Sequence, residues 1–196
     1  MNNYLLTKDQ CEDYKADGFG KSKNNDGSGC IKMFIHIRKD SMIPSFDALT
    51  DLKYLSKNME DQVALTASLI EMVTDGGGMF IEDILKLQER DIYSMAGESL
   101  ELGEVRPVVA LHALKKAICN YFKETDQDER YRKATETVIC SCRHVTDSDI
   151  EDLIQNGKTS YDEISSITGA GTGCGSCKNN VKEFIEKKVK TGLGNI

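Results

Sequence analysis

The chain has 196 residues, of which 39% are hydrophobic and 29% are charged, and its formal net charge is -7 at pH 7. This length accommodates one medium domain or two small ones. The negative charge argues against nucleic acid or an anionic membrane surface as the main partner and favours protein partners. No stretch approaches the roughly 20 apolar residues of a membrane span, and the polar N-terminus does not resemble a secretory signal. Seven cysteines, an odd number, favour a reducing compartment. We therefore expect a cytoplasmic protein.

The first part of the chain predicts a small antiparallel sheet. The polar, glycine-bearing run 21–29 predicts a loop. Alternating apolar residues over 31–37 predict a half-buried strand, and a second, weaker strand is expected over 45–52. His36 lies on the polar side of the first strand, where we expect a solvated residue rather than a metal ligand.

Helices are predicted after these strands. Apolar residues recur at helical spacing from Asp61 and stop at the glycines that begin with Gly76. A shorter helix is expected around Ile84, and a longer one begins at Pro107, a favourable first-turn residue. Cys119 and His112 in that helix are expected to be packing or surface residues rather than metal ligands. The predicted fold class is therefore α+β, with a small antiparallel sheet packed by helices at the N-terminal end.

A charged segment divides the chain. Residues 123–136 contain almost nothing apolar, which predicts a solvated linker or the frayed end of a helix. We therefore expect one domain over residues 1–124, a charged linker over 125–136 and a second domain over 137–190.

The second domain is predicted to consist of short helices only. Thr146 and Ser160 have the character of helix N-caps, because Asp149 and Glu163 follow each of them by three residues. A last amphipathic helix is expected from about Lys178. A core of this size is marginal by itself, so a metal centre would add stability.

Two cysteine pairs in this domain form the candidate functional site, Cys140-Ser-Cys142 and Cys174-Gly-Ser-Cys177. Thiolates at such short spacing bind soft or borderline metals, which leaves an iron–sulfur cluster or zinc. The second pair lies in a run with four glycines over residues 169–177, and such a run can direct backbone N–H groups at an anionic cluster. Arg143 and Lys178, each next to a cysteine, would offset part of the negative charge. We interpret the four cysteines as ligands of a [2Fe–2S] cluster.

The spacing of the cysteines leaves zinc binding and thiol redox chemistry open as alternatives. Zinc usually takes two C-x-x-C pairs closer together in the chain, a pattern that the first pair does not follow. A redox-active C-x-x-C would leave the first pair without a role. A helix–turn–helix role in DNA binding is disfavoured by the acidic helix predicted after Thr146.

The motifs resemble those of a known family. Val138-Ile-Cys-Ser-Cys-Arg-His-Val-Thr-Asp and Gly171-Thr-Gly-Cys-Gly-Ser-Cys177 are similar to the BFD-like [2Fe–2S] domain, which occurs in bacterioferritin-associated ferredoxin and within NifU. The resemblance covers about residues 136 to 190. It implies that Cys140, Cys142, Cys174 and Cys177 ligate the cluster.

The first domain is similar, more faintly, to the U-type scaffold of NifU and IscU. The resemblance rests on Thr66-Ala-Ser-Leu-Ile-Glu-Met-Val73, Glu82-Asp-Ile-Leu and Ala113-Leu-Lys-Lys-Ala-Ile118. Such scaffolds assemble clusters on three cysteines. Cys30 stands at the first place, whereas Lys57-Asn-Met-Glu60 and Val105-Arg-Pro107, at the other two, contain none.

This combination implies an iron–sulfur protein of cluster assembly, with a permanent [2Fe–2S] centre for one-electron transfer and a degenerate scaffold. The degenerate domain would dock a cysteine desulfurase or form a homodimer. The alternative functions are a ferredoxin-like redox partner of an iron-storage protein or reductase, and a zinc-binding interaction module. No nucleophile with an adjacent base and no paired carboxylates point to catalysis, so we do not expect an enzyme.

Overall fold

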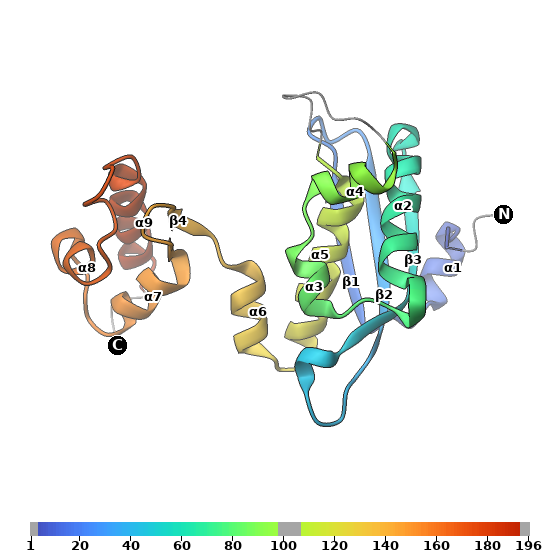
Figure 1. The fold of residues 1–196 in the computed structure, drawn as a ribbon, viewed down its shortest axis with the longest axis horizontal. Coiled ribbons are helices and arrows are strands. Elements are labelled where there is room, and N and C mark those ends of the chain that lie inside the picture. The colour runs from blue at the N-terminus through green and yellow to red at the C-terminus, as the bar shows by residue number, and fades with distance from the viewer. Residues whose placement is uncertain (1–3, 98–106, 193–196) are drawn as a thin grey trace. The chain divides into compact units, whose positions relative to one another are not determined.

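The structure is a computed structural model that describes residues 4–97 and 107–192. The chain forms two compact units, one reaching to Tyr131 and the other beginning at Arg132 (Figure 1). The first unit combines an antiparallel sheet with helices and the second is mainly helical, so the predicted α+β class is confirmed. In the described parts of the chain, no helix is both long and apolar enough to cross a membrane.

The first unit is a three-stranded sheet covered by helices. The strands pair antiparallel in the order β1-β2-β3, and α5 lies against β1 and β2 (Figure 1). Its elements are α1 (Lys8–Asp13), β1 (Gly18–Lys23), β2 (Cys30–Arg38), η1 (Pro44–Phe46), β3 (Ala48–Lys57), η2 (Glu60–Gln62), α2 (Val63–Thr74), η3 (Asp75–Gly77), α3 (Ile81–Lys86), α4 (Glu89–Met95) and α5 (Val109–Glu124).

Strand β2 confirms the alternation predicted from the sequence. Its residues Ile31, Met33 and Ile35 are buried, as the predicted inward face requires. The opposite face is less exposed than its pattern suggests, because Phe34 packs against the rings of Tyr14 and Phe19 at centroid distances of 5.9 and 5.3 Å.

Strand β1 begins before the predicted loop and includes its first residues. The reason is close helix packing: a Cβ at Gly20 would overlap the carbonyl oxygen of Ala113, and one at Gly18 would overlap that of Ala117. These two glycines therefore let α5 approach the strand directly. Glycine is a turn signal in a sequence, but here it marks a close contact between two elements.

The charged segment, expected to be a solvated linker or the frayed end of a helix, contains a short helix of its own. Residues Asp128–Thr135 form helix α6, and the boundary between the two units lies within it. Arg130 of this helix is only 16% exposed and packs its guanidinium 4.4 Å from the ring centroid of Phe122.

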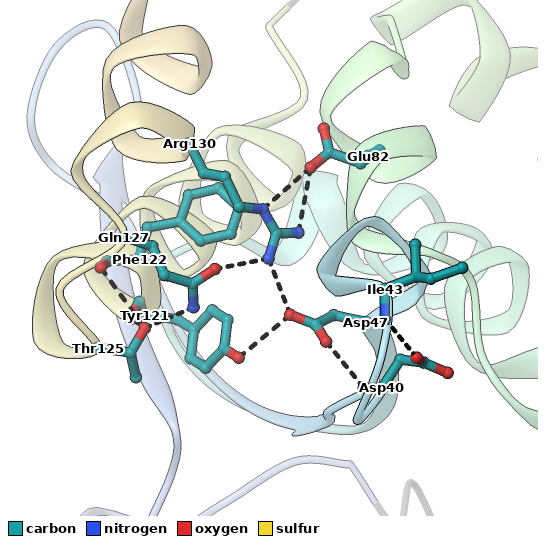
Figure 2. A network of polar contacts seen from close by, with 9 residues as sticks. All are labelled: Asp40, Ile43, Asp47, Glu82, Tyr121, Phe122, Thr125, Gln127 and Arg130. Carbon is teal, nitrogen blue, oxygen red and sulfur yellow. Dashed lines mark hydrogen bonds and ion pairs between the residues drawn. The ribbon is translucent and has the colours of Figure 1, made fainter.

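Arg130 binds two carboxylates of the first unit (Figure 2). Its Nη1 donates to Asp47 Oδ2 at 2.8 Å, and its Nε donates to Glu82 Oε1 at 3.1 Å. Asp47 is almost fully buried, so its charge needs this partner. The ion pairs of Arg130 with Asp47 and Glu82, which lie far from it in the sequence, therefore hold the start of α6 against the rest of the first unit.

The second unit is built from short helices and a minimal two-stranded ladder. The ladder pairs β4 (Val138–Cys140) with β5 (Val145–Thr146) and is the one departure from the predicted all-α unit among the described residues. The helices are α7 (Asp147–Gln155), α8 (Tyr161–Thr168) and α9 (Lys178–Lys190).

Both predicted N-caps are confirmed. Thr146 Oγ1 accepts a hydrogen bond from Asp149 N at 3.2 Å, and Ser160 Oγ accepts one from Glu163 N at 3.3 Å. The acidic side chains accept in turn from the backbone N–H of the cap residue, so each start is a complete capping box.

Candidate metal centre

The fold of the second unit brings the two cysteine pairs together. Cys140 ends β4, and Cys142 lies in the turn that follows. Cys174 lies in the loop after α8, and Cys177 is the N-cap residue of α9. Cys142 Sγ is 3.7 Å from Cys140 Sγ and 3.7 Å from Cys174 Sγ, although the pairs lie far apart in the sequence.

These separations suit thiolates that share a metal centre. Tetrahedral metal–sulfur bonds of about 2.3 Å place neighbouring ligand sulfurs about 3.8 Å apart. Zinc and iron both satisfy this distance, so the donor set fits a thiolate-bound centre without choosing the metal.

Glycines shape the loop that carries the second pair. Gly169 ends α8 in the left-handed conformation with φ 72°, and Gly171 follows with φ 77°. A Cβ at Gly171 would overlap the hydroxyl of Tyr161, and one at Gly173 would lie 3.2 Å from Cys142 Sγ. The loop therefore passes close to the sulfurs because these positions carry no side chains.

In one cysteine of each pair, hydrogen bonds lower the pKa and so favour the thiolate form that metals bind. The backbone N–H of Gly171 and then the Cys177 thiol lower the pKa of Cys140 to about 7. The hydroxyl of Ser176, 3.1 Å from Cys174 Sγ, lowers the pKa of that thiol as well. Cys140 is thus prepared to lose its proton near neutral pH, and the pKa of Cys174 is shifted in the same direction.

The four thiols differ in exposure. Cys140 and Cys177 are 0% and 6% exposed and pack with the apolar core of the unit, whereas Cys142 and Cys174 are exposed. Each pair therefore has one buried and one exposed member. The site is anchored in the core on one side and reaches the surface on the other.

The two cations predicted beside the cysteines behave differently. The side chain of Arg143 lies along the glycine loop, where its Nε would be 3.4 Å from a Cβ at Gly169 and 3.9 Å from one at Gly173. The Lys178 amine instead lies 5.8 Å from the ring centroid of Tyr161. The Arg143 side chain therefore lies along the thiol loop, whereas the Lys178 amine lies over the ring of Tyr161, whose hydroxyl borders Gly171 of the same loop.

The two histidines considered in the first unit both lie beside carboxylates of that unit. His36 Nδ1 is 3.4 Å from Asp17 Oδ2, and His112 Nε2 is 2.8 Å from Glu89 Oε1. Both histidines are partly exposed and lie beside carboxylates, which agrees with the solvated position expected for His36 and with the packing or surface position expected for His112.

The second and third places expected for scaffold cysteines both contribute to one pocket of the first unit, which we call the scaffold pocket. Its volume is about 250 Å³. Met59, from the second of the three places, is buried and fills the space beside Gly29. Val105 and Arg106, from the third, lie outside the described residues. Among the described residues that line the pocket there is no cysteine: Asn24, Asn25, Asp26, Met59, Asp61, Gln62, Pro107 and Val109.

Comparison with known proteins identifies the second unit. The BFD-like [2Fe-2S] binding domain family matches residues 138–187, a range that contains all four cysteines. Bacterioferritin-associated ferredoxin of Pseudomonas aeruginosa is 41% identical over 51 residues, which cover 26% of this chain and 70% of that protein. Nitrite reductase [NAD(P)H] of Emericella nidulans is 43% identical over 55 residues, covering 27% of this chain and 5% of the reductase.

Longer similarities include the first unit. Nitrogen fixation protein NifU of Trichormus azollae is 27% identical over 159 residues, and the NifU of a Nostoc strain is 26% identical over 158 residues. Each match covers 76% of this chain and 50% of the relative, so the chain spans about half the length of these NifU proteins.

These findings decide between the metals left open by geometry. The matched family binds [2Fe–2S], so the predicted cofactor is confirmed over zinc. The assignment of individual ligands stays a prediction that the sulfur geometry supports. Over a longer range the chain is similar to NifU, and through residues 138–187 it belongs to the BFD-like [2Fe–2S] binding family.

Proposed function

We propose that Cys140, Cys142, Cys174 and Cys177 hold a permanent [2Fe–2S] centre through which the protein passes single electrons to a protein partner during iron–sulfur cluster assembly. In this role the protein is a non-catalytic carrier. The observation that carries the proposal is the division of the four thiols into a buried and an exposed half.

The residues of the second unit divide the task. When bound, a [2Fe–2S] centre supplies a one-electron couple. Cys140 and Cys177 tie the site to the core, which favours a resident centre over a transient one. The exposed Cys142 and Cys174 allow a partner surface to approach the site closely. Arg143 places a positive charge beside the thiol loop, where it favours the anionic state.

The assembly role rests on the first unit. Its similarity to U-type scaffolds supports a protein that meets the partners of cluster assembly, such as a cysteine desulfurase. The scaffold pocket contributes no thiol among its described residues, so electrons rather than new clusters are the expected contribution of this chain.

A second candidate function is a ferredoxin-like redox partner outside cluster assembly. The absence of a thiol among the described residues of the scaffold pocket favours this second function, since a scaffold without assembly cysteines has no evident need for a desulfurase. The similarity to bacterioferritin-associated ferredoxin and to nitrite reductases points to an iron-storage protein or a reductase as the electron acceptor.

Anaerobic purification of the full chain tests the centre. We expect about two irons and two sulfides per chain and a spectrum that dithionite bleaches, with an EPR signal on reduction. The Cys30→Ser variant should retain the same content and spectrum, because Cys30 lies in the first unit. Zinc without sulfide would refute the redox function.

Co-purification with a cysteine desulfurase distinguishes the two roles. Stable binding that survives loss of the cluster in Cys142→Ser would support the assembly role through the first unit. Absence of desulfurase binding, together with rapid oxidation of the reduced protein by an iron-storage protein or reductase, would replace it by the second candidate.

A further inference from the structure

The loop between β2 and β3 exposes large apolar side chains at one end of the first unit. Met42 is 84% exposed, Ile43 44% and Phe46 49%, and Phe80 beside them is 43% exposed. The rings of Phe46 and Phe80 stack with centroids 5.6 Å apart. We call Met42, Ile43, Phe46 and Phe80 the β2–β3 patch. Contiguous apolar exposure of this kind marks interaction surfaces.

The loop is held in one conformation by its own hydrogen bonds. Asp40 Oδ1 accepts from the backbone N–H groups of Met42 at 2.9 Å and Ile43 at 2.7 Å. Phe46 N donates to the carbonyl of Ile43 at 2.8 Å. The apolar side chains therefore project from an ordered turn, which extends past the end of the sheet (Figure 1). An ordered loop loses little conformational entropy when a partner binds.

A buried network supports the loop from beneath (Figure 2). Asp47, at the end of the loop, accepts from Asp40 N at 2.9 Å through one carboxylate oxygen. Its other oxygen accepts from Arg130 Nη1 at 2.8 Å and from the Tyr121 hydroxyl at 3.4 Å. The loop is thus fixed to α5 and α6 by a nearly inaccessible carboxylate.

A cleft of about 340 Å³ lies against the two rings and is lined by Arg38, Lys39, Asp40, Ser41, Phe46 and Phe80. Its two cations are exposed, and neither forms an ion pair with a described carboxylate at salt-bridge distance; the Lys39 amine lies 5.6 Å from the ring centroid of Tyr121. The single acid, Asp40, is engaged by backbone N–H groups of the turn. The cleft therefore combines apolar walls with available positive charge.

We propose that the β2–β3 patch and its cleft dock a segment of a partner protein that presents a large apolar side chain next to carboxylates. The rings and Met42 would receive the apolar side chain, and Arg38 and Lys39 would pair with the flanking acids. A second copy of this chain fits less well, because a symmetric contact would bring the same two cations face to face.

Selection of random displayed peptides on the cluster-loaded full chain tests this proposal. We expect a consensus with a Leu, Phe or Trp flanked by Asp or Glu. The selected peptide, measured by fluorescence polarisation, should bind at least about tenfold more weakly to Phe46→Ser and to Lys39→Glu. Met95→Ser and Lys21→Glu are matched controls, because Met95 is also 49% exposed and Lys21 is an exposed lysine elsewhere.

Any outcome other than these would overturn the proposal. An absence of enriched peptides, a consensus without acids, or equal binding to Phe46→Ser and the parent chain would each show that this surface does not recognise such a segment. Sedimentation equilibrium covers the alternative occupant: a dimer of the parent chain that Phe46→Ser dissociates would assign the patch to a second copy. An unchanged visible spectrum in every variant keeps this test independent of the iron–sulfur function.

Discussion

The two units of this protein are stabilised by different means. The first has a large apolar core, to which β2 and β3 contribute Ile31, Met33, Ile35 and Leu52, and α5 packs against the sheet. The second has a far smaller core, in which two of the buried residues are cysteines of the metal site: Cys140, Val145, Ile150, Ile154, Ile164, Ala170, Cys177, Val181 and Ile185. The candidate metal centre is therefore part of the core of the second unit. The described core of the first unit, in contrast, consists of packed side chains and includes no metal-site cysteine.

This difference indicates where the stability of each unit comes from. A unit with few apolar side chains is marginal without a cross-link or metal. The thiols of the second unit connect three places in the chain: strand β4, the turn after β4 and the start of α9. The apolar core of this unit connects these places only in part. We therefore expect cluster loss to loosen the second unit and to leave the first intact.

The largest effect should follow removal of a ligand. Cys142→Ser and Cys140→Ser should each abolish the visible spectrum and lower the hydrogen-exchange protection of the second unit by at least about tenfold. Peptides from the first unit should show unchanged exchange. Cys140→Ser should be the more damaging of the two, because it also leaves a hydroxyl in the core at a cost of about 1–3 kcal/mol.

Cys119→Ser is the control for these variants, since Cys119 belongs to α5 of the first unit. A normal spectrum in Cys142→Ser would contradict the ligand assignment. Equal loosening of both units would contradict the proposed difference between them.

The second effect concerns the border between the units. Arg130→Met removes the partner of the buried Asp47, so the free energy of unfolding of the first unit should fall by about 3–5 kcal/mol. Lys86→Met, which breaks an exposed pair with Asp83, should leave the free energy of unfolding almost unchanged. Urea unfolding followed by circular dichroism measures both. A loss of the cluster spectrum in folded Arg130→Met would show that the residue serves the second unit instead.

A smaller effect tests the close contact between β1 and α5. Gly20→Ala should destabilise the first unit by about 1–3 kcal/mol, because the new Cβ would meet the backbone of Ala113. Ser22→Ala on the same buried side of β1 is the control and should cost less, because that position already carries a Cβ. Thermal unfolding compares them, and equal melting temperatures would contradict the packing described for this strand.

The smallest effect belongs to the caps of the second unit. Ser160→Ala removes the N-cap of α8 and should cost about 1 kcal/mol. The neighbouring Thr159→Ala should be close to neutral, since Thr159 is exposed and is not the cap. In the cluster-free protein the Ser160 substitution should lower the free energy of unfolding of the second unit by more, because the remaining core is weaker. An identical cost with and without the cluster would argue against a core that depends on the metal.

Much of this architecture could be predicted from local patterns. The alternation over 31–37, the N-caps at Thr146 and Ser160 and the helix from Lys178 all appear in the structure where they were expected. The grouping of the cysteines into two pairs was also visible, since short spacing within each pair limits the chemistry they serve. Such features depend on residues a few positions apart, and the sequence displays those neighbours directly.

The sequence could not predict features that depend on distant partners. Strand β1 was not predicted, because its glycines are required by the backbone of α5, nearly a hundred residues later. Helix α6 lies in the segment predicted as a solvated linker or frayed helix end, because nothing near Arg130 in the sequence shows that its charge is buried against Asp47 and Glu82. Neither contact leaves a local pattern.

The sequence by itself determined the element types of most of the chain and the thiolate chemistry of the second unit, because periodicity, capping and ligand spacing are local properties. Only the tertiary structure decided that each cysteine pair has one buried and one exposed member, and that Met59 fills the space beside Gly29. The physical reason is that burial, and with it the exposure of a redox site, is set by packing between segments that the sequence does not show as neighbours.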